Sequence, residues 1–246
     1  MPEVLQAGGW GLLAGSALVL GALAGYLIRV PRRVVAGVMA FGSGVLISAV
    51  AYDLIEDAHD RGGLAPTAAG AAAGALIYTG ANVLLARQGA RHRKRSGGQQ
   101  AAERQEGSGT AIALGALLDG VPESIVIGAS LLTGGAVSAV TVIAVFISNV
   151  PEGLSSASGM RRSGRGPRYV FGLWTGIAVL SGLAAVLGYT VLGDASGSVM
   201  AAITALAAGA MLTMIADTMI PEAFEDAHLL SGLITVAGFL TAFSLT

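Results

Sequence analysis

The chain contains no cysteine, so it can form neither disulfides nor thiolate metal sites. Charged residues make up only 12% of its 246 residues. A soluble domain would carry about 25%. Aromatic residues (5%) and histidines (three) are also scarce. No nucleotide-binding motif is found, so coupling to ATP within this chain is not expected. Enzymatic activity is not expected. No nucleic-acid partner is expected either.

Apolar residues and glycine dominate instead. The chain is 54% hydrophobic and has 37 glycines, a residue that is common in membrane helices. The beginning "MPEVLQAGG" has no basic residue before the first apolar run, which argues against a cleaved signal peptide. We therefore predict an integral membrane protein whose first apolar segment is retained.

Eight apolar segments have about the 20 residues that a spanning helix needs. The alternating pattern of an outer-membrane barrel is absent. The sequence thus predicts an all-α protein, with one transmembrane domain over residues 1–246 and eight spans. The expected spans are 8–29, 34–55, 65–86, 109–132, 136–159, 169–192, 197–219 and 229–245.

The basic residues predict the orientation of these spans. Thirteen of the fourteen lie in loops that the eight-span topology places on one side of the membrane, and only Arg61 lies on the other side. The positive-inside rule places the thirteen in the cytoplasm, so both termini face outward across the cytoplasmic membrane. Residues 87–108 are expected to form a flexible basic cytoplasmic loop. Contact of this loop with anionic lipid headgroups is the alternative.

Two segments on different spans resemble each other. "GVLISAVAYDLIEDA" (44–58) aligns without gaps with "GAMLTMIADTMIPEA" (209–223), and the two run in opposite directions through the predicted topology. Chance similarity between two Ala/Gly/Ile-rich helices is the competing explanation. The alignment favours an inverted repeat that relates spans one to three to spans six to eight, around a central pair of spans four and five.

The central pair carries two polar motifs, "DGVPES" (119–124) and "SNVPEG" (148–153). Asp119 and Glu123 are four residues apart, as are Ser148 and Glu152, so each pair shares a helix face. Each motif also contains a proline, which frees a backbone carbonyl of the preceding turn. Asp119 lies roughly 15 Å into its span at 1.5 Å per residue, and the two motifs are expected to meet near mid-membrane.

The three carboxylates of these motifs are costly in a membrane. Each costs about 2.5–3.5 kcal/mol when ionised at the centre of a span. No Lys or Arg lies inside any predicted span except Arg29 at an end, so we expect no internal counter-charge. A cation bound from outside would supply it. Protonated carboxyls that hydrogen-bond helices together are the alternative. The predicted ligands are all oxygen donors, which favour harder ions: Asp119, Glu123, Ser148, Asn149 and Glu152.

The two motifs resemble those of the ZIP (Zrt/Irt-like) family of divalent-metal transporters. The family pattern in span four is His-Asn-x-Pro-Glu-Gly, where this chain has "DGVPES", and span five has a similar pattern, where this chain has "SNVPEG". Asp119 and Ser148 stand where the family often has histidine, and Gly120 replaces a ligand of a second metal position. The resemblance implies one metal site around Asp119, Glu123 and Glu152, with Asn149 beside it.

Two acidic clusters lie at the ends of spans two and seven. Asp53 and Asp57 mark the outer end of span two, and Asp217 and Glu222 mark the inner end of span seven. They are interpreted either as solvated helix ends or as an entrance and an exit that concentrate cations.

Together these patterns predict a secondary transporter that moves a divalent metal ion, zinc, iron, manganese or cadmium, as its substrate. No permanently bound cofactor is expected, and the inward direction is implied by the resemblance. The sequence leaves open a passive divalent-cation channel, a proton- or sodium-coupled carrier of another solute, and a structural membrane protein. It also leaves open whether the chain forms a homodimer.

Overall fold

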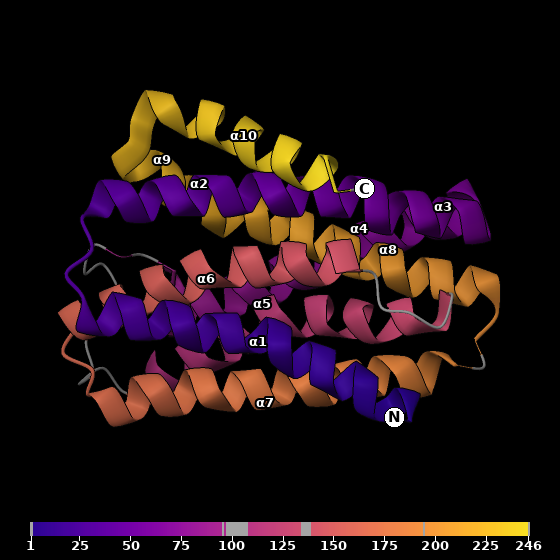
Figure 1. Cartoon of the computed structure of the whole chain (residues 1–246), viewed down its shortest axis with the longest axis horizontal. Coiled ribbons are helices and arrows are strands. Elements are labelled where there is room, and N and C mark those ends of the chain that lie inside the picture. The colour runs from indigo at the N-terminus through magenta and orange to yellow at the C-terminus, as the bar shows by residue number, and fades with distance from the viewer. Residues whose placement is uncertain (1, 95, 97–107, 134–138, 194, 246) are drawn as a thin grey trace.

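The computed structural model describes residues 2–94, 96, 108–133, 139–193 and 195–245, and within these residues every regular element is a helix (Figure 1). Short π or 3₁₀ stretches, labelled η, interrupt or extend the α-helices. The elements are α1 (Glu3–Leu27), α2 (Arg32–Ser48), η1 (Ala49–Ile55), α3 (Glu56–Gly62), α4 (Leu64–Leu85), η2 (Ala86–Ala90), α5 (Ser108–Ser130), η3 (Leu131–Thr133), α6 (Ala139–Arg162), α7 (Pro167–Leu192), α8 (Gly197–Met214), η4 (Ile215–Met219), α9 (Ile220–Ala227), η5 (His228–Leu230) and α10 (Ser231–Phe243).

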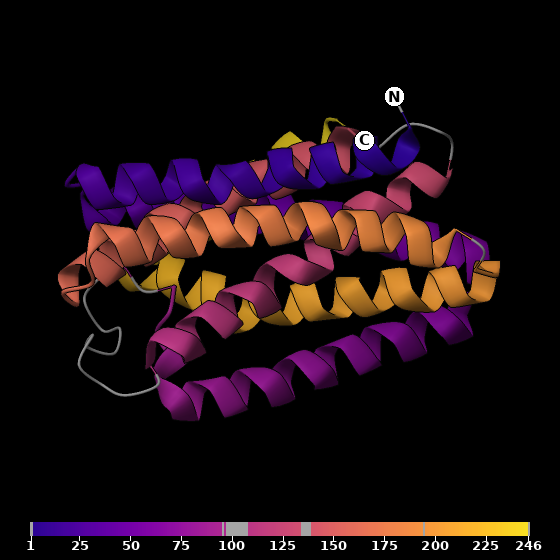
Figure 2. The same cartoon turned by 90° about the horizontal axis from the view of Figure 1, so that it is seen from below.

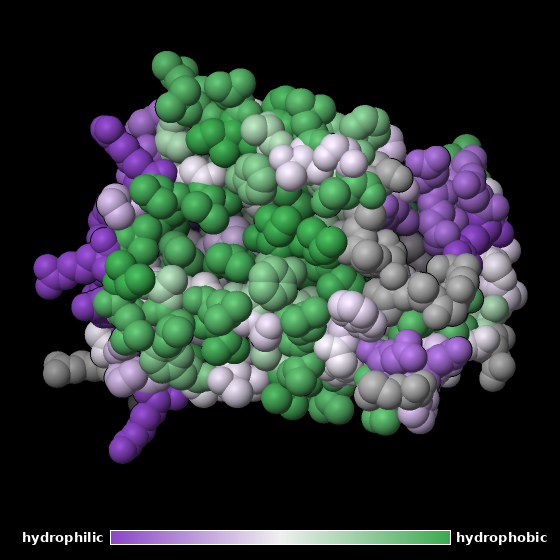
Figure 3. Space-filling model, in the orientation of Figure 1, coloured by the Kyte–Doolittle hydropathy of each residue, from purple (hydrophilic) through white to green (hydrophobic). Residues whose placement is uncertain are grey.

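Six helical stretches in the described part of the chain are long and apolar enough to cross a membrane: Glu3–Leu27, Arg32–Gly62, Leu64–Ala90, Ile112–Ser130, Pro167–Leu192 and Gly197–Phe243. Large apolar side chains such as Leu76, Leu84 and Leu187 point outward and are exposed. Figure 3 shows a broad apolar band across the middle of the bundle, with hydrophilic residues gathered at its two ends. This is the surface of a multi-pass membrane protein.

The stretch Gly197–Phe243 contains two helical rods that run in opposite directions. The first comprises α8, η4 and α9, and the chain then reverses at His228, whose φ is 44°. Figure 1 shows α10 returning alongside α2. The 24-residue helix α6 is not one of the six apolar stretches, although the sequence predicts a span at 136–159. Its polar motif and its terminal arginines make it less apolar than the others.

Several helices continue beyond the predicted ends of their spans. The helix expected to end at residue 55 runs on through α3 to Gly62, and the one expected to end at residue 219 continues to Ala227. Charged side chains can be solvated beyond the hydrocarbon core of a membrane. Charged residues therefore mark where a span ends, although the helix itself continues. Of the loop expected at 87–108, only residues 87–94, Ser96 and the first residue of α5 are described, and Ala86–Ala90 is helical.

The helices pack in a small set of partnerships. Helix α1 contacts α6 and α7, α4 contacts α8, α10 contacts α2, and α5 contacts α7. Figure 2 shows α5 crossing the bundle obliquely, from beside the end of α4 toward α7. Helices α5 and α6, which carry the two polar motifs, each pack against several other helices.

Glycine allows the backbones of two of these pairs to touch. A Cβ atom at Gly44 in α2 would lie 1.9 Å from the carbonyl oxygen of Thr235 in α10. A Cβ atom at Gly209 in α8 would lie 2.0 Å from the carbonyl oxygen of Ala71 in α4. Such small residues are typical of membrane helix interfaces, because they let backbones approach closely.

Gly44→Ala is expected to destabilise the bundle by about 1–3 kcal/mol, because α2 and α10 must separate to accommodate the methyl group. Unfolding in detergent, followed by circular dichroism, would measure the loss. Gly172→Ala on α7 is the matched control, since a Cβ there meets nothing within 4 Å. Equal stabilities of the two variants would show that the α2–α10 contact is not tight.

Candidate functional site

The two polar motifs lie inside α5 and α6, each with its proline in the helix interior. Asp119 and Glu123 project from α5, and Glu152 projects from α6. The relative exposures of Asp119, Glu123 and Glu152 are 2%, 2% and 4%. All three predicted carboxylates are therefore buried within the bundle, and their charges need partners there.

Two basic side chains from the segment before α5 supply positive charge to these carboxylates. Arg93 binds Asp119 through two parallel contacts, from Nε to Oδ2 and from Nη2 to Oδ1, each of 2.9 Å. Lys94 Nζ lies 2.8 Å from Glu152 Oε2 and 3.4 Å from Asp119 Oδ2. Lys94 therefore joins the carboxylates of α5 and α6. The expectation that the site has no internal counter-charge is wrong.

The chain reaches the site by folding back after η2. Gly89 within η2 has a φ of 99°, a conformation that glycine adopts without a Cβ penalty. Residues 91–94 then form a turn that buries Arg93 and Lys94, with 2% and 3% of their surface exposed. Sequence hydropathy places both residues in a loop between spans. It does not reveal that the loop turns inward.

Side chains of α4 complete the surroundings of Arg93. Tyr78 donates a hydrogen bond to Asp119 Oδ1, and its hydroxyl oxygen accepts one from Arg93 Nη2 at 3.0 Å. Arg93 Nη1 donates to Asn82 Oδ1 at 2.8 Å. Burial by itself lowers the pKa of Arg93, but attraction to Asp119 and the hydrogen bonds between them raise it overall, so the guanidinium stays charged.

The backbone of the same segment is held by α6 and α9. Ser156 Oγ donates to the Arg93 carbonyl at 2.7 Å, and Ser155 Oγ donates to the Lys94 carbonyl at 2.5 Å. Glu222 Oε1 accepts from the Ser96 amide at 2.8 Å and lies 2.9 Å from Ser155 Oγ. Glu222, predicted from the sequence as part of an exit path, is buried at this contact.

Glu123 differs from the other two carboxylates in its contacts. Its Oε1 atom is buried and has no hydrogen-bond partner among the residues that the structure describes. Glu152, Lys94 and Asp119 lie near enough to interact with it electrostatically. The role of Glu123 as a metal ligand stays a prediction.

The structure uses Ser148 and Asn149 in helix contacts. Ser148 Oγ donates to the carbonyl of Val145 in its own helix at 2.9 Å, and Asn149 Nδ2 donates to the carbonyl of Ala14 in α1 at 3.0 Å. Neither bond involves the three carboxylates. Their role as metal ligands stays a prediction.

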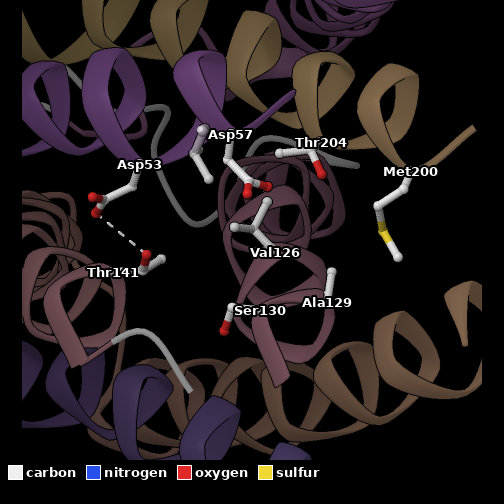
Figure 4. A pocket seen from close by; sticks show the side chains of 9 residues that line it. Asp53, Asp57, Val126, Ala129, Ser130, Thr141, Met200 and Thr204 are labelled. Atoms are coloured by element: carbon white, nitrogen blue, oxygen red, sulfur yellow. Dashed lines mark hydrogen bonds between the residues drawn. The ribbon is translucent and has the colours of Figure 1, made fainter. Parts of the chain in front are cut away.

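A cavity of about 200 Å³ opens near the junction of η1 and α3, and both Asp53 and Asp57 line it (Figure 4). Asp53 Oδ2 accepts a hydrogen bond from Thr141 Oγ1 at 3.3 Å, which is the dashed line in Figure 4. Asp57 forms an ion pair with Arg61 Nε at 2.7 Å. Met200 of α8 also lines this cavity.

A second cavity, of about 320 Å³, lies beside the Arg93–Lys94 segment. Asp217 of η4 and Asn82 of α4 line it together with Arg93 and Lys94. Asp217 itself is exposed. The predicted exit residue therefore borders the two basic side chains that contact the central carboxylates.

In this conformation, the described residues contain no group of three or more His, Cys, Asp or Glu side chains arranged to hold a metal ion. Asp119 and Glu152 instead bind two side-chain cations. No protein-family model and no curated protein matches the sequence.

Sequence reasoning missed Tyr78, Arg93, Lys94, Ser155 and Ser156. One signal for them is the tyrosine in the apolar third span, whose hydroxyl needs a partner when it is buried. The other signal is the three span carboxylates, which need positive charge.

Proposed function

We propose that the chain is a secondary transporter that carries a divalent metal ion of the zinc, iron or manganese class into the cytoplasm. The observation that carries the proposal is the contact of Asp119 in α5 and Glu152 in α6 with the same cationic group, Lys94 Nζ. Two proline-containing helices thus form a buried position that binds positive charge. The resemblance of their motifs to those of the ZIP family favours a metal ion as the substrate.

The proposed path runs from the Asp53–Asp57 cavity, past Glu123, to the central carboxylates and then to the Asp217 cavity. These two cavities border different parts of the bundle, one at η1 and α3 and the other at η2 and η4. Carboxylates at each mouth raise the local concentration of cations.

In this proposal, the chain forms eight spans of the cytoplasmic membrane, with both termini outside. The rods would be α1, α2–α3, α4–η2, α5, α6, α7, α8–α9 and η5–α10. The basic residues of the turns at one end would face the cytoplasm.

The proposal includes an inverted repeat of spans one to three and six to eight. Its support is a set of close contacts that recur in pairs. The contact of Gly44 with the Thr235 carbonyl corresponds to that of Gly209 with the Ala71 carbonyl. Three more contacts between a glycine and a backbone carbonyl recur in the same way. The Gly238–Phe41 contact corresponds to Gly74–Leu206, and Gly153–Leu18 corresponds to Gly128–Ala185. The Gly21–Val150 contact corresponds to Gly188–Ile125. Figure 1 shows α2 and α8 running in opposite directions, as such a repeat requires.

Two π-helical stretches also support the repeat. The stretch η1 (Ala49–Ile55) and the stretch η4 (Ile215–Met219) fall at corresponding positions of the segments 44–58 and 209–223. π-Bulges are rare and often lie at functional sites, so their occurrence in both halves favours a common architecture.

A second candidate is a proton-coupled carrier of another solute. The observation that favours it is the buried Glu123 Oε1, which has no hydrogen-bond partner among the described residues and is available to bind a proton. Buried acids of membrane helices often relay protons. A passive channel would use the same acids but would give flux that does not saturate.

Uptake of labelled zinc, manganese, iron and cadmium into proteoliposomes tests the function. Wild type is expected to show saturable uptake of at least one ion, and Glu152→Ala is expected to lose it, because Glu152 is the α6 carboxylate of the cation position. Arg87→Gln is the control, since Arg87 is exposed and lies outside the site. Unchanged uptake of every ion in Glu152→Ala would disprove the central site.

A further inference from the structure

Arg93 and Lys94 together bring two positive charges to the carboxylates of Asp119 and Glu152. One divalent ion bound by the same two carboxylates would bring the same charge. The side chains occupy the space directly at the carboxylate oxygens, since their nitrogen atoms lie 2.8–3.4 Å from them. A metal ion that binds these same oxygens would therefore compete with the two side chains for the carboxylates.

We propose that Arg93 and Lys94 are a tethered replacement for the transported ion. A divalent metal that enters the site displaces both side chains, and they return when the metal leaves. The inference rests on the proposed function and adds to it a mechanism of exchange and a reason for divalent selectivity.

The energetic reason for such a replacement is the cost of an empty site. An ionised carboxylate near the centre of a span costs about 2.5–3.5 kcal/mol without a counter-charge. A transporter must pass through a state without substrate in each cycle. With Arg93 and Lys94 bound, that state has the same charge as the metal-bound state, so no coupling ion is needed to neutralise it.

The same exchange would discriminate against monovalent ions. Sodium or potassium brings one charge, so it can replace only one of the two side chains if the total charge of the site is to stay the same. The other side chain would remain in the site or leave a carboxylate without a partner, which is unfavourable in the buried environment of Asp119 and Glu152.

The attachment of the segment is compatible with its release. Its backbone is held by individual hydrogen bonds from Ser155, from Ser156 and to Glu222, and no regular helix continues through residues 91–94. The adjacent cavity of about 320 Å³ provides room for the displaced side chains. Asp217 at this cavity offers them a carboxylate outside the site.

Removal of the two side-chain cations is expected to strengthen metal binding. The double variant R93Q/K94Q no longer carries the competing charges. Its affinity for the ion that wild type transports best should therefore rise at least about tenfold, which corresponds to about 1.4 kcal/mol of binding free energy. Equilibrium dialysis of that labelled ion against the purified full chain measures the affinity. Arg87→Gln, which removes an exposed charge from the neighbouring η2, should bind like wild type.

A second measurement follows the segment itself in a chain that keeps Arg93 and Lys94. The protein has no cysteine, so Ser96→Cys introduces a single thiol at a position that is only 3% exposed. Saturation with the transported ion should raise its rate of labelling by a membrane-impermeant maleimide several-fold, and sodium chloride of equal ionic strength should not. Arg168→Cys, at an exposed position of α7, controls for direct binding of the metal to a thiol.

The outcomes separate this inference from the function on which it rests. If wild type transports a metal but the double variant binds it no more tightly and Ser96→Cys stays protected, the replacement is wrong while the function stands. If wild type neither binds nor transports any of the four metals, the proposed function is wrong, and the replacement is wrong with it.

Discussion

Asp119→Asn is expected to destabilise the protein by about 3–5 kcal/mol, because it breaks the buried ion pair between Asp119 and the Arg93 guanidinium. Asparagine has nearly the shape of aspartate, so little of this loss would come from packing. It can accept only one of the two charge-assisted bonds that Arg93 now makes to the carboxylate. Unfolding in mixed detergent micelles, followed by circular dichroism, measures the change.

The double variant D119N/R93Q tests whether the loss comes from this pair. Removal of the Arg93 charge as well should recover part of the stability, and a coupling energy of about 0.5–3 kcal/mol is expected for two residues in contact. Asp60→Asn, on the exposed end of α3, is the control and should unfold like wild type. A D119N variant as stable as this control would contradict the buried ion pair.

Glu123→Gln is expected to abolish most metal uptake while leaving the fold intact. The side chain is buried, and its Oε1 has no hydrogen-bond partner in the described part of the chain, so an amide of nearly the same shape breaks no hydrogen bond to that atom. If Glu123 is a ligand of the transported ion, uptake should fall by at least about tenfold, since changes in the outer shell of metal sites alone cost 10–100-fold in affinity.

Two readouts of this variant must be taken together. Its unfolding midpoint should equal or exceed that of wild type, and its uptake should fall at every metal concentration tested. Glu56→Gln, an exposed acid at the start of α3, is the matched control for loss of one negative charge. Uptake by Glu123→Gln within about twofold of wild type would remove Glu123 from the proposed path; such a difference is below about 0.5 kcal/mol.

The helical, membrane-spanning character could be predicted because it depends on local properties. In lipid, a backbone has no water to bind, so a long apolar segment must form its hydrogen bonds within itself as a helix. The polar motifs could be found for a similar reason: carboxylates and prolines inside apolar segments are conspicuous in any window. The structure places Asp119, Glu123 and Glu152 in the buried interior of α5 and α6.

Helix α6 is a segment whose environment cannot be predicted from its own hydropathy. Its motif and terminal arginines lower its hydropathy, and it is not among the stretches that length and composition alone identify as able to cross a membrane. Its position next to α1 and α2, which carry apolar surfaces of their own, gives it an environment that its own composition does not indicate.

By itself, the sequence determined an all-helical membrane protein with three buried acids on two proline-containing helices, because helix formation in lipid and the cost of charge there depend on short windows of residues. Only the tertiary structure decided what neutralises those acids. Arg93 is 26 residues from Asp119 in the chain, and Ser96 is 126 residues from Glu222. Contacts over such separations depend on how the helices pack and how the chain turns at Gly89, and no local pattern of charge or hydropathy contains that information.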